Sequence, residues 1–169
     1  MKTLKKRRKQ NKTDYARRIN LLKGGSPRIV FRKTNRYIIA EYVTSKEAQD
    51  KVELGITSKV LLGYGWPKEF QGSLKSIPAT YLTGFLLGKD IIKKKLIMPI
   101  IDIGMARSLP KNKIFGFLKG LKDSGLDIKT NEEYHPEENR IKGKHLKNDF
   151  SKIFDGIKLK IQKETGNEK

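Results

Sequence analysis

The chain has 169 residues, of which 38 are Lys or Arg and 18 are Asp or Glu, so its formal net charge is +20 and its isoelectric point is near 10.1. Because it contains no cysteine, structural disulfides, iron–sulfur clusters and cysteine zinc sites are excluded. It has no run of about eighteen apolar residues and no apolar segment after its basic start, so we expect a cytoplasmic protein without a membrane span or secretory signal, whose partner is a polyanion.

The positive charge is concentrated at the N-terminus. Residues 1–36 hold 14 basic residues and one acidic residue, and seven of the basic ones lie in residues 2–12. Since Met1 and Leu4 are its only large apolar side chains, the stretch 1–12 cannot bury a core, and we expect a flexible basic arm that is disordered when free. Evenly spread lysines indicate a solvated surface, whereas a concentrated arm is typical of phosphate binding, and we favour nucleic acid over an anionic membrane surface.

A short basic helix is expected directly after the arm. Thr13 can cap a helix that begins at Asp14, and Gly24 with Gly25 can end it. The arm therefore continues into a helix, and residues 13–165 are expected to form a single α/β RNA-binding domain with a frayed tail at 166–169.

Three strands are expected after this helix. From Arg28 the pattern has a period of two, with Ile29 and Phe31 alternating with Val30 and Arg32, and a second β-rich run spans 37–43 after a basic turn at 33–36. A third alternating run spans 51–57. This order predicts an antiparallel meander.

The following elements alternate between helix and strand. Ser76 can cap a helix over 79–87 that Gly88 can stop. An almost continuous apolar run at 96–103 predicts a strand covered on both faces, in which Pro99 favours an edge or a bulge.

The last part of the chain is expected to be helical. Apolar residues at helical spacing predict a helix over 111–124, stopped by Gly125, and a second one from about His145 to Gln162. We therefore predict an α/β fold, a compact mixed sheet with the antiparallel meander and one further strand, packed with helices and preceded by the flexible basic arm.

The candidate RNA-binding residues are basic, aromatic or amide side chains of the arm, the first helix and the hairpin. Arginine is the best phosphate ligand among them because its guanidinium group binds phosphate with two parallel hydrogen bonds. The candidates are Lys5, Lys6, Arg7, Arg8, Lys9, Lys12, Tyr15, Arg17, Arg18, Arg28, Arg32, Lys33, Asn35 and Arg36.

Aromatic residues among these charges either stack unpaired bases or pack in the core. For Phe31 we favour the core because it alternates with polar neighbours, whereas both interpretations stay open for Tyr15 and Tyr37. Trp66 is expected to close an edge of the core.

No metal or catalytic site is predicted. The two histidines, His135 and His145, are ten positions apart among surface carboxylates, and solvated charge explains them better than a metal site. A two-metal nuclease needs several carboxylates at strand ends, but only Asp102 lies in a convincing strand, where we expect it to accept structural hydrogen bonds.

The order of motifs along residues 12–146 resembles the universal large-subunit ribosomal protein eighteen family in its archaeal and eukaryotic branch, which includes the eukaryotic 5S-binding large-subunit protein five. The match is loose at residues 44–62 and irregular at 68–75. The motifs are Lys12-Thr13-Asp14-Tyr15 with Arg17-Arg18, the stretch 27–35 (PRIVFRKTN), Gly65-Trp66, 78–84 (PATYLTG), Asp102-Ile103-Gly104, 115–125 (FGFLKGLKDSG) and 137–143 (EENRIKG).

The resemblance implies a structural protein of the large ribosomal subunit, without catalysis or cofactor. It implies that the basic arm and sheet bind 5S rRNA, that the protein helps to build the central protuberance, and that it contacts 23S rRNA and a neighbouring 5S-binding ribosomal protein. It also implies a monomer within the ribosome. We assign the acid-rich stretch 132–138 to protein contacts or packing, because carboxylates repel phosphate.

Two rival functions remain, an RNA-processing nuclease and an architectural DNA-binding protein on a similar α/β domain. Carboxylates converging on Asp102 would favour the nuclease. Composition does not separate RNA from DNA, so the choice of 5S rRNA depends on the resemblance.

Overall fold

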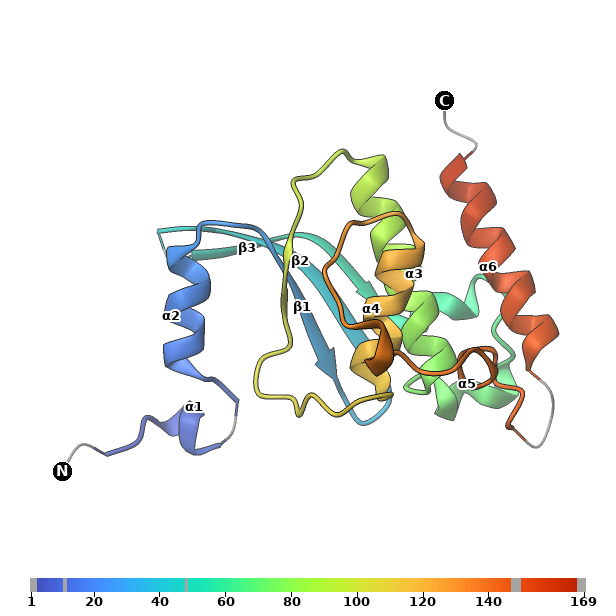
Figure 1. Ribbon diagram of the computed structural model, residues 1–169, viewed down its shortest axis with the longest axis horizontal. Coiled ribbons are helices and arrows are strands. Elements are labelled where there is room, and N and C mark those ends of the chain that lie inside the picture. The colour runs from blue at the N-terminus through green and yellow to red at the C-terminus, as the bar shows by residue number, and fades with distance from the viewer. Residues whose placement is uncertain (1–2, 11, 48, 147–149, 167–169) are drawn as a thin grey trace.

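The computed structural model in Figure 1 describes residues 3–10, 12–47, 49–146 and 150–166. After the arm, these residues form a helix, three consecutive strands, and then helices with one further strand among them. The helices are α1 (Lys6–Lys9), α2 (Tyr15–Lys23), α3 (Ile77–Lys93), α4 (Lys113–Asp123), α5 (Glu138–Lys142) and α6 (Ser151–Gly166), with short 3-10 helices η1 (Ser58–Leu62), η2 (Lys68–Ser73) and η3 (Glu132–Tyr134). The strands are β1 (Arg28–Lys33), β2 (Ile38–Lys46), β3 (Gln49–Thr57) and β4 (Ile100–Asp102).

The four strands form one mixed sheet in the order β3-β2-β1-β4. β1 and β2 pair antiparallel, with Phe31 opposite Ala40, and β2 and β3 continue the meander. β4 then pairs parallel to β1, with Ile101 opposite Ile29. The predicted class, a mixed sheet with an antiparallel meander and one further strand packed with helices, is confirmed.

The alternation in β1 sends its side chains to two different environments. Ile29 and Phe31 are buried, and the Phe31 ring lies 5.0 Å from that of Phe117 in α4, which confirms the core interpretation of Phe31. Val30 is half-buried and Arg32 is exposed, because residues at a spacing of two share a face of the strand. One face of β1 thus packs on the helical layer and the other is available for contacts outside the core.

Helices α3 and α4 run side by side and parallel, in direct contact (Figure 1). A Cβ atom on Gly120 would lie 2.2 Å from the Tyr81 carbonyl oxygen, and one on Gly84 would lie 2.4 Å from that of Phe117. Gly88 lies in the same contact, since its Cβ would meet Ser124 Oγ at 1.9 Å. The prediction that Gly88 stops the helix is therefore wrong: α3 continues to Lys93, and the glycine serves close packing.

Other boundaries also differ from the prediction. Asp14 rather than Thr13 caps α2, because its carboxylate accepts the Arg17 N–H. β4 lies at the edge of the sheet and occupies only 100–102 of the predicted 96–103. Pro99 has no N–H group for strand pairing, and the first hydrogen bond to the neighbouring strand runs from Ile100 N to Pro27 O at 2.9 Å.

The last helix, α6, begins at Ser151 rather than near residue 145. Residues 147–149 and 167–169 of the predicted helix and tail lie outside the described residues, as do 1–2 and 11 of the arm.

Trp66 is 3% exposed, with its ring 4.7 Å from that of Phe150, which confirms its place in the core. Within the described residues no helix combines the length and apolar character required to cross a membrane.

Candidate nucleic-acid interface

Helix α2 presents its side chains to solvent and to a neighbouring loop rather than to the core. None of its residues is buried. Arg17 Nη1 donates to the Gly104 carbonyl oxygen at 3.3 Å, and Arg18 Nη2 lies 2.7 Å from Asp50 Oδ2. These contacts hold α2 beside the loop at 103–112 and the start of β3, so that a space remains between the helix and the sheet.

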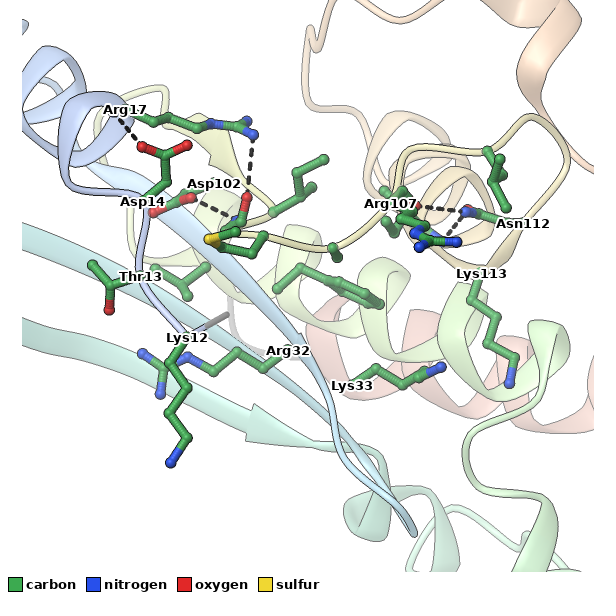
Figure 2. A pocket seen from close by; sticks show the side chains of 18 of the residues that line it. Lys12, Thr13, Asp14, Arg17, Arg32, Lys33, Asp102, Arg107, Asn112 and Lys113 are labelled. Carbon is green, nitrogen blue, oxygen red and sulfur yellow. Dashed lines mark hydrogen bonds between the residues drawn. The ribbon is translucent and has the colours of Figure 1, made fainter. Parts of the chain in front are cut away.

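That space is a groove of about 1070 Å³ (Figure 2). Its lining comes from the arm, α2, β1, the end of β4, the loop at 103–112, the starts of α3 and α4, and one residue of α5. Ten of the lining residues are basic and two are acidic. The basic ones are Arg7, Lys12, Arg17, Arg18, Arg32, Lys33, Arg107, Lys111, Lys113 and Arg140.

The two acidic residues of the groove have partners within the protein. Asp14 lies 3.1 Å from the Arg8 guanidinium group and caps α2. Asp102 accepts from the Gly104 N–H at 2.9 Å and from Arg28 Nη1 at 3.4 Å, which confirms its predicted role as a structural acceptor. Because both carboxylates are compensated from inside the protein, the groove offers a net positive surface to a ligand.

Arg28 differs from the other predicted ligands because it is only 2% exposed. Its guanidinium group lies 2.7 Å from Asp50 Oδ1, donates to Ser45 Oγ at 2.9 Å and pairs with Asp102. Burial opposes ionisation of Asp50, but hydrogen bonds from Ser45 and Arg18 and the charges of Arg28 and Arg18 lower the pKa of this carboxyl group. Arg28 thus holds the strands together, and its assignment as a phosphate ligand is corrected.

The remaining candidates divide between the groove and its surroundings. Six of the candidate RNA-binding residues line the groove: Arg7, Lys12, Arg17, Arg18, Arg32 and Lys33. Outside the lining, Arg8 pairs with Asp14, and Arg36 is exposed in the hairpin turn, where Asn35 O accepts from Lys75 Nζ. The others outside the lining, Lys5, Lys6, Lys9 and Tyr15, belong to the arm and the start of α2, and only Tyr15 among them is partly buried.

The aromatic residues near the groove have contacts of their own. The Lys5 ammonium group lies 4.6 Å from the centroid of the Tyr15 ring. Tyr37 packs against the core while remaining partly exposed. Base stacking by either tyrosine stays a prediction.

Four basic residues of the groove are not among the sequence candidates. Arg107 and Lys111 lie in the loop after β4, Lys113 begins α4, and Arg140 lies in α5. The polar side of the predicted helix 111–124 is rich in lysine, and Arg140 belongs to a family motif. A sequence pattern therefore indicated the lysines of this helix and Arg140. Arg107 had none, because an irregular loop carries no periodicity that could show which way it faces.

In the part of the chain that the structure describes, Asp102 does not belong to a cluster of metal-binding carboxylates. Within the described residues, no group of three or more His, Cys, Asp and Glu side chains is placed to hold a metal ion. The groove therefore offers cations for binding an anionic chain and lacks, in this part of the protein, the converging acids of a two-metal nuclease.

Comparison with known proteins gives consistent matches. A family model described as ribosomal large subunit proteins 60S L5 and 50S L18 matches residues 1–100, which include the arm, α2 and β1 to β3. The large ribosomal subunit protein uL18 of Methanoculleus marisnigri is 42% identical over 141 residues, 83% of this chain and 78% of that protein. The uL18 proteins of Korarchaeum cryptofilum and Natronomonas pharaonis are 40% and 34% identical over 93% and 90% of this chain, and 78% and 80% of their own lengths.

Proposed function

The chain belongs to the family of ribosomal large subunit proteins 60S L5 and 50S L18, and on that premise we propose that it binds 5S rRNA and attaches it to the large subunit as part of the central protuberance. Membership of this family makes the chain a structural constituent of the large ribosomal subunit, located on the ribosome in the cytoplasm. The prediction of a ribosomal protein rather than an enzyme is confirmed.

The observation that supports RNA binding is the groove, with ten basic and two acidic lining residues. Its two carboxylates are compensated internally and its basic residues far outnumber them, so an RNA backbone entering the groove meets a net positive surface. RNA phosphates carry one negative charge per nucleotide and match such a surface better than a neutral ligand does.

The two sides of the groove contribute differently to binding. The arm and α2 supply exposed side chains that meet phosphates but hold no fixed arrangement of bases. β1 and the hairpin turn at 33–36 are fixed by strand pairing, and their cations therefore favour a particular RNA shape. We assign affinity mainly to the first side and selectivity mainly to the second.

Two further partners belong to the proposal, 23S rRNA and a neighbouring 5S-binding ribosomal protein, with the chain as a monomer within the ribosome. The exposed carboxylates of Glu133, Glu137 and Glu138 support a protein contact, since they would repel a phosphate backbone. Glu137 is moreover 3.1 Å from Lys111, so that the acid-rich stretch adjoins the groove.

The test of 5S binding is a competition measurement with the full chain. Labelled 5S rRNA is bound first, and unlabelled 5S rRNA, an unrelated structured RNA and duplex DNA of equal length then compete for the protein. We expect 5S rRNA to compete best. Equal competition by duplex DNA would overturn the proposal in favour of an architectural DNA-binding protein.

A charge-reversal variant tests the assignment of selectivity. Arg32→Glu with Lys33→Glu should weaken binding to 5S rRNA more than binding to the unrelated RNA. The matched control is Lys152→Glu with Lys163→Glu, which makes the same charge change on α6, outside the groove lining. Equal losses for both RNAs would mean that the hairpin contributes charge alone.

A further inference from the structure

Two lysines that line the groove and a third that is bound to the hairpin turn come from three separate parts of the chain. Lys33 ends β1, Lys113 begins α4, and Lys75 precedes α3 by two residues. Figure 2 shows the Lys33 and Lys113 side chains extending toward the same space, and both line the groove. Lys75 is oriented by a hydrogen bond of 2.8 Å from its Nζ to the carbonyl oxygen of Asn35, in the turn that follows β1.

The fold fixes this arrangement through the parallel packing of α3 and α4. The first turns of the two helices meet, since a Cβ atom on Gly116 would lie 3.3 Å from Ile77 Cγ2. Lys75 and Lys113 are therefore carried to the same end of the helix pair, next to the hairpin turn. Because Lys33 and Lys113 lie in regular elements and Lys75 is held by its hydrogen bond to Asn35, the arrangement does not depend on the arm.

The cluster has no internal counter-charge. Within the described ranges, none of the three lysines forms an ion pair with a carboxylate. Burial, followed by the charges of Lys33 and Lys75, lowers the pKa of Lys113. Lys113 therefore lies near two other cations, and this repulsion carries an electrostatic cost that a bound anion would offset.

The free donors of the cluster are ammonium groups rather than helix ends. The Ser76 side chain caps α3 through the Ala79 N–H, and the Asn112 side chain accepts from Ile114 N and Phe115 N at the start of α4. Lys75 uses one of its three N–H donors on Asn35 and keeps two. The remaining N–H groups suit a tetrahedral anion with several acceptor oxygens.

We propose that Lys33, Lys75 and Lys113 form a seat for one backbone phosphate of the bound RNA, on the folded domain and independent of the arm. The proposal rests on the proposed function for the identity of the RNA, since the phosphate belongs to 5S rRNA. This fixed contact positions the RNA along the groove, at the end where α3 and α4 begin.

The test compares two double variants of the full chain that remove equal charge. Lys33→Gln with Lys113→Gln should weaken 5S rRNA binding about tenfold, as expected for lost charge-assisted hydrogen bonds, and reduce the slope of log affinity against log salt by roughly 0.7–0.9. Lys152→Gln with Lys163→Gln, on α6, should change neither quantity to that extent. The melting temperature of the first variant should be unchanged or higher, because repulsion is removed, whereas a structural role would lower it.

A second measurement tests the seat without requiring 5S binding. The lysine side-chain NMR signals are followed while 5S rRNA, and separately inorganic pyrophosphate, is added to the wild-type protein. We expect shifts at Lys33, Lys75 and Lys113 with both, and none at Lys152. If pyrophosphate shifts the lysine signals but 5S rRNA does not bind, the phosphate site is retained and the proposed function is overturned. If 5S rRNA binds but the two double variants lose equal affinity, or the signals of the three lysines do not shift, the phosphate site alone is overturned.

Discussion

The α3–α4 pair and the N-terminal segment with α1 and α2 use their side chains in opposite ways. Every residue of α3 from Pro78 to Gly88 is buried, and α4 buries seven residues against it. In α1 and α2 no residue is buried. Packing therefore restricts which residues α3 and α4 can contain. The exposed N-terminal segment can carry many charged side chains without any loss of packing.

The same difference occurs within a single strand, β1. Arg28 is enclosed by two carboxylates, while the Arg32 side chain is 64% exposed and lies 3.7 Å from Glu41. Two arginines on one face of one strand therefore have different environments: Arg28 is enclosed by ion pairs and Arg32 is open to solvent.

The strongest test of this comparison removes a ring from the helical layer. Phe117→Ala should lower the free energy of unfolding by about 3–5 kcal/mol, since Phe117 is fully buried, and Phe154→Ala should act similarly. RNA affinity measured below the melting temperature should stay unchanged. Chemical denaturation and RNA titration measure the two effects, and Leu159→Ala, at an exposed position of α6, is the control. Wild-type melting together with a loss of RNA binding would show that these apolar stripes are interfaces.

A second test separates the two arginines of β1. Arg28→Gln should destabilise the fold by about 2–3 kcal/mol, less than the loss of a fully buried partner because the Asp50 side chain is 30% exposed. Arg32→Gln should leave stability within about 0.5 kcal/mol and weaken RNA binding instead. Urea unfolding and RNA titration of both variants measure this, and equal effects on stability would contradict the distinction.

Deletion of residues 1–12 should affect only RNA binding. Affinity for all structured RNAs should fall at least about tenfold, roughly 1.4 kcal/mol, and the salt slope should decrease by roughly 0.7–0.9 for each phosphate that the arm no longer neutralises. The melting temperature should be nearly unchanged, since the ion pair from Arg8 to Asp14 that the deletion removes is exposed. An unchanged salt slope would show that the arm is not an RNA anchor.

The smallest expected effect is a pH dependence that comes from Asp50. Its pKa is lowered from 3.8 in the folded protein, so its contribution to stability is present above pH 3.8 and is lost as the pH falls through the folded pKa. Asp50→Asn should be less stable than wild type at neutral pH, and the two stability curves should converge in acid. Urea unfolding from neutral pH to about pH 3 measures this, with Asp155→Asn as a control on α6, and a constant difference between the curves would contradict it.

Much of the fold could be predicted because local patterns report burial directly. The alternation in β1 and β3 and the apolar stripe of α4 have periods that depend only on backbone geometry. Gly88 could not be interpreted in this way, because a helix stop and a close helix contact both require glycine. Only the position of Ser124, far along the chain, shows which applies.

Only the basic residues on the N-terminal side of the groove could be predicted from the sequence. Arg17, Arg18 and Arg32 belong to a region of concentrated charge, so composition indicated them. The partners of Arg28 are 22 and 74 residues away, and no local pattern could show that its charge is already matched. Arg107 likewise reaches the groove only through the tertiary path of its loop.

The parallel pairing of β1 with β4 has a consequence for the order of events during synthesis. The hairpin partner of β1 follows it immediately, but the other edge of β1 has to wait until residue 100 has been made. Over that interval the arm is already available to RNA, while Arg28 still lacks Asp102. On a growing chain the basic N-terminal segment thus precedes the completed sheet, and the groove residues Lys113 of α4 and Arg140 of α5 are made after β4.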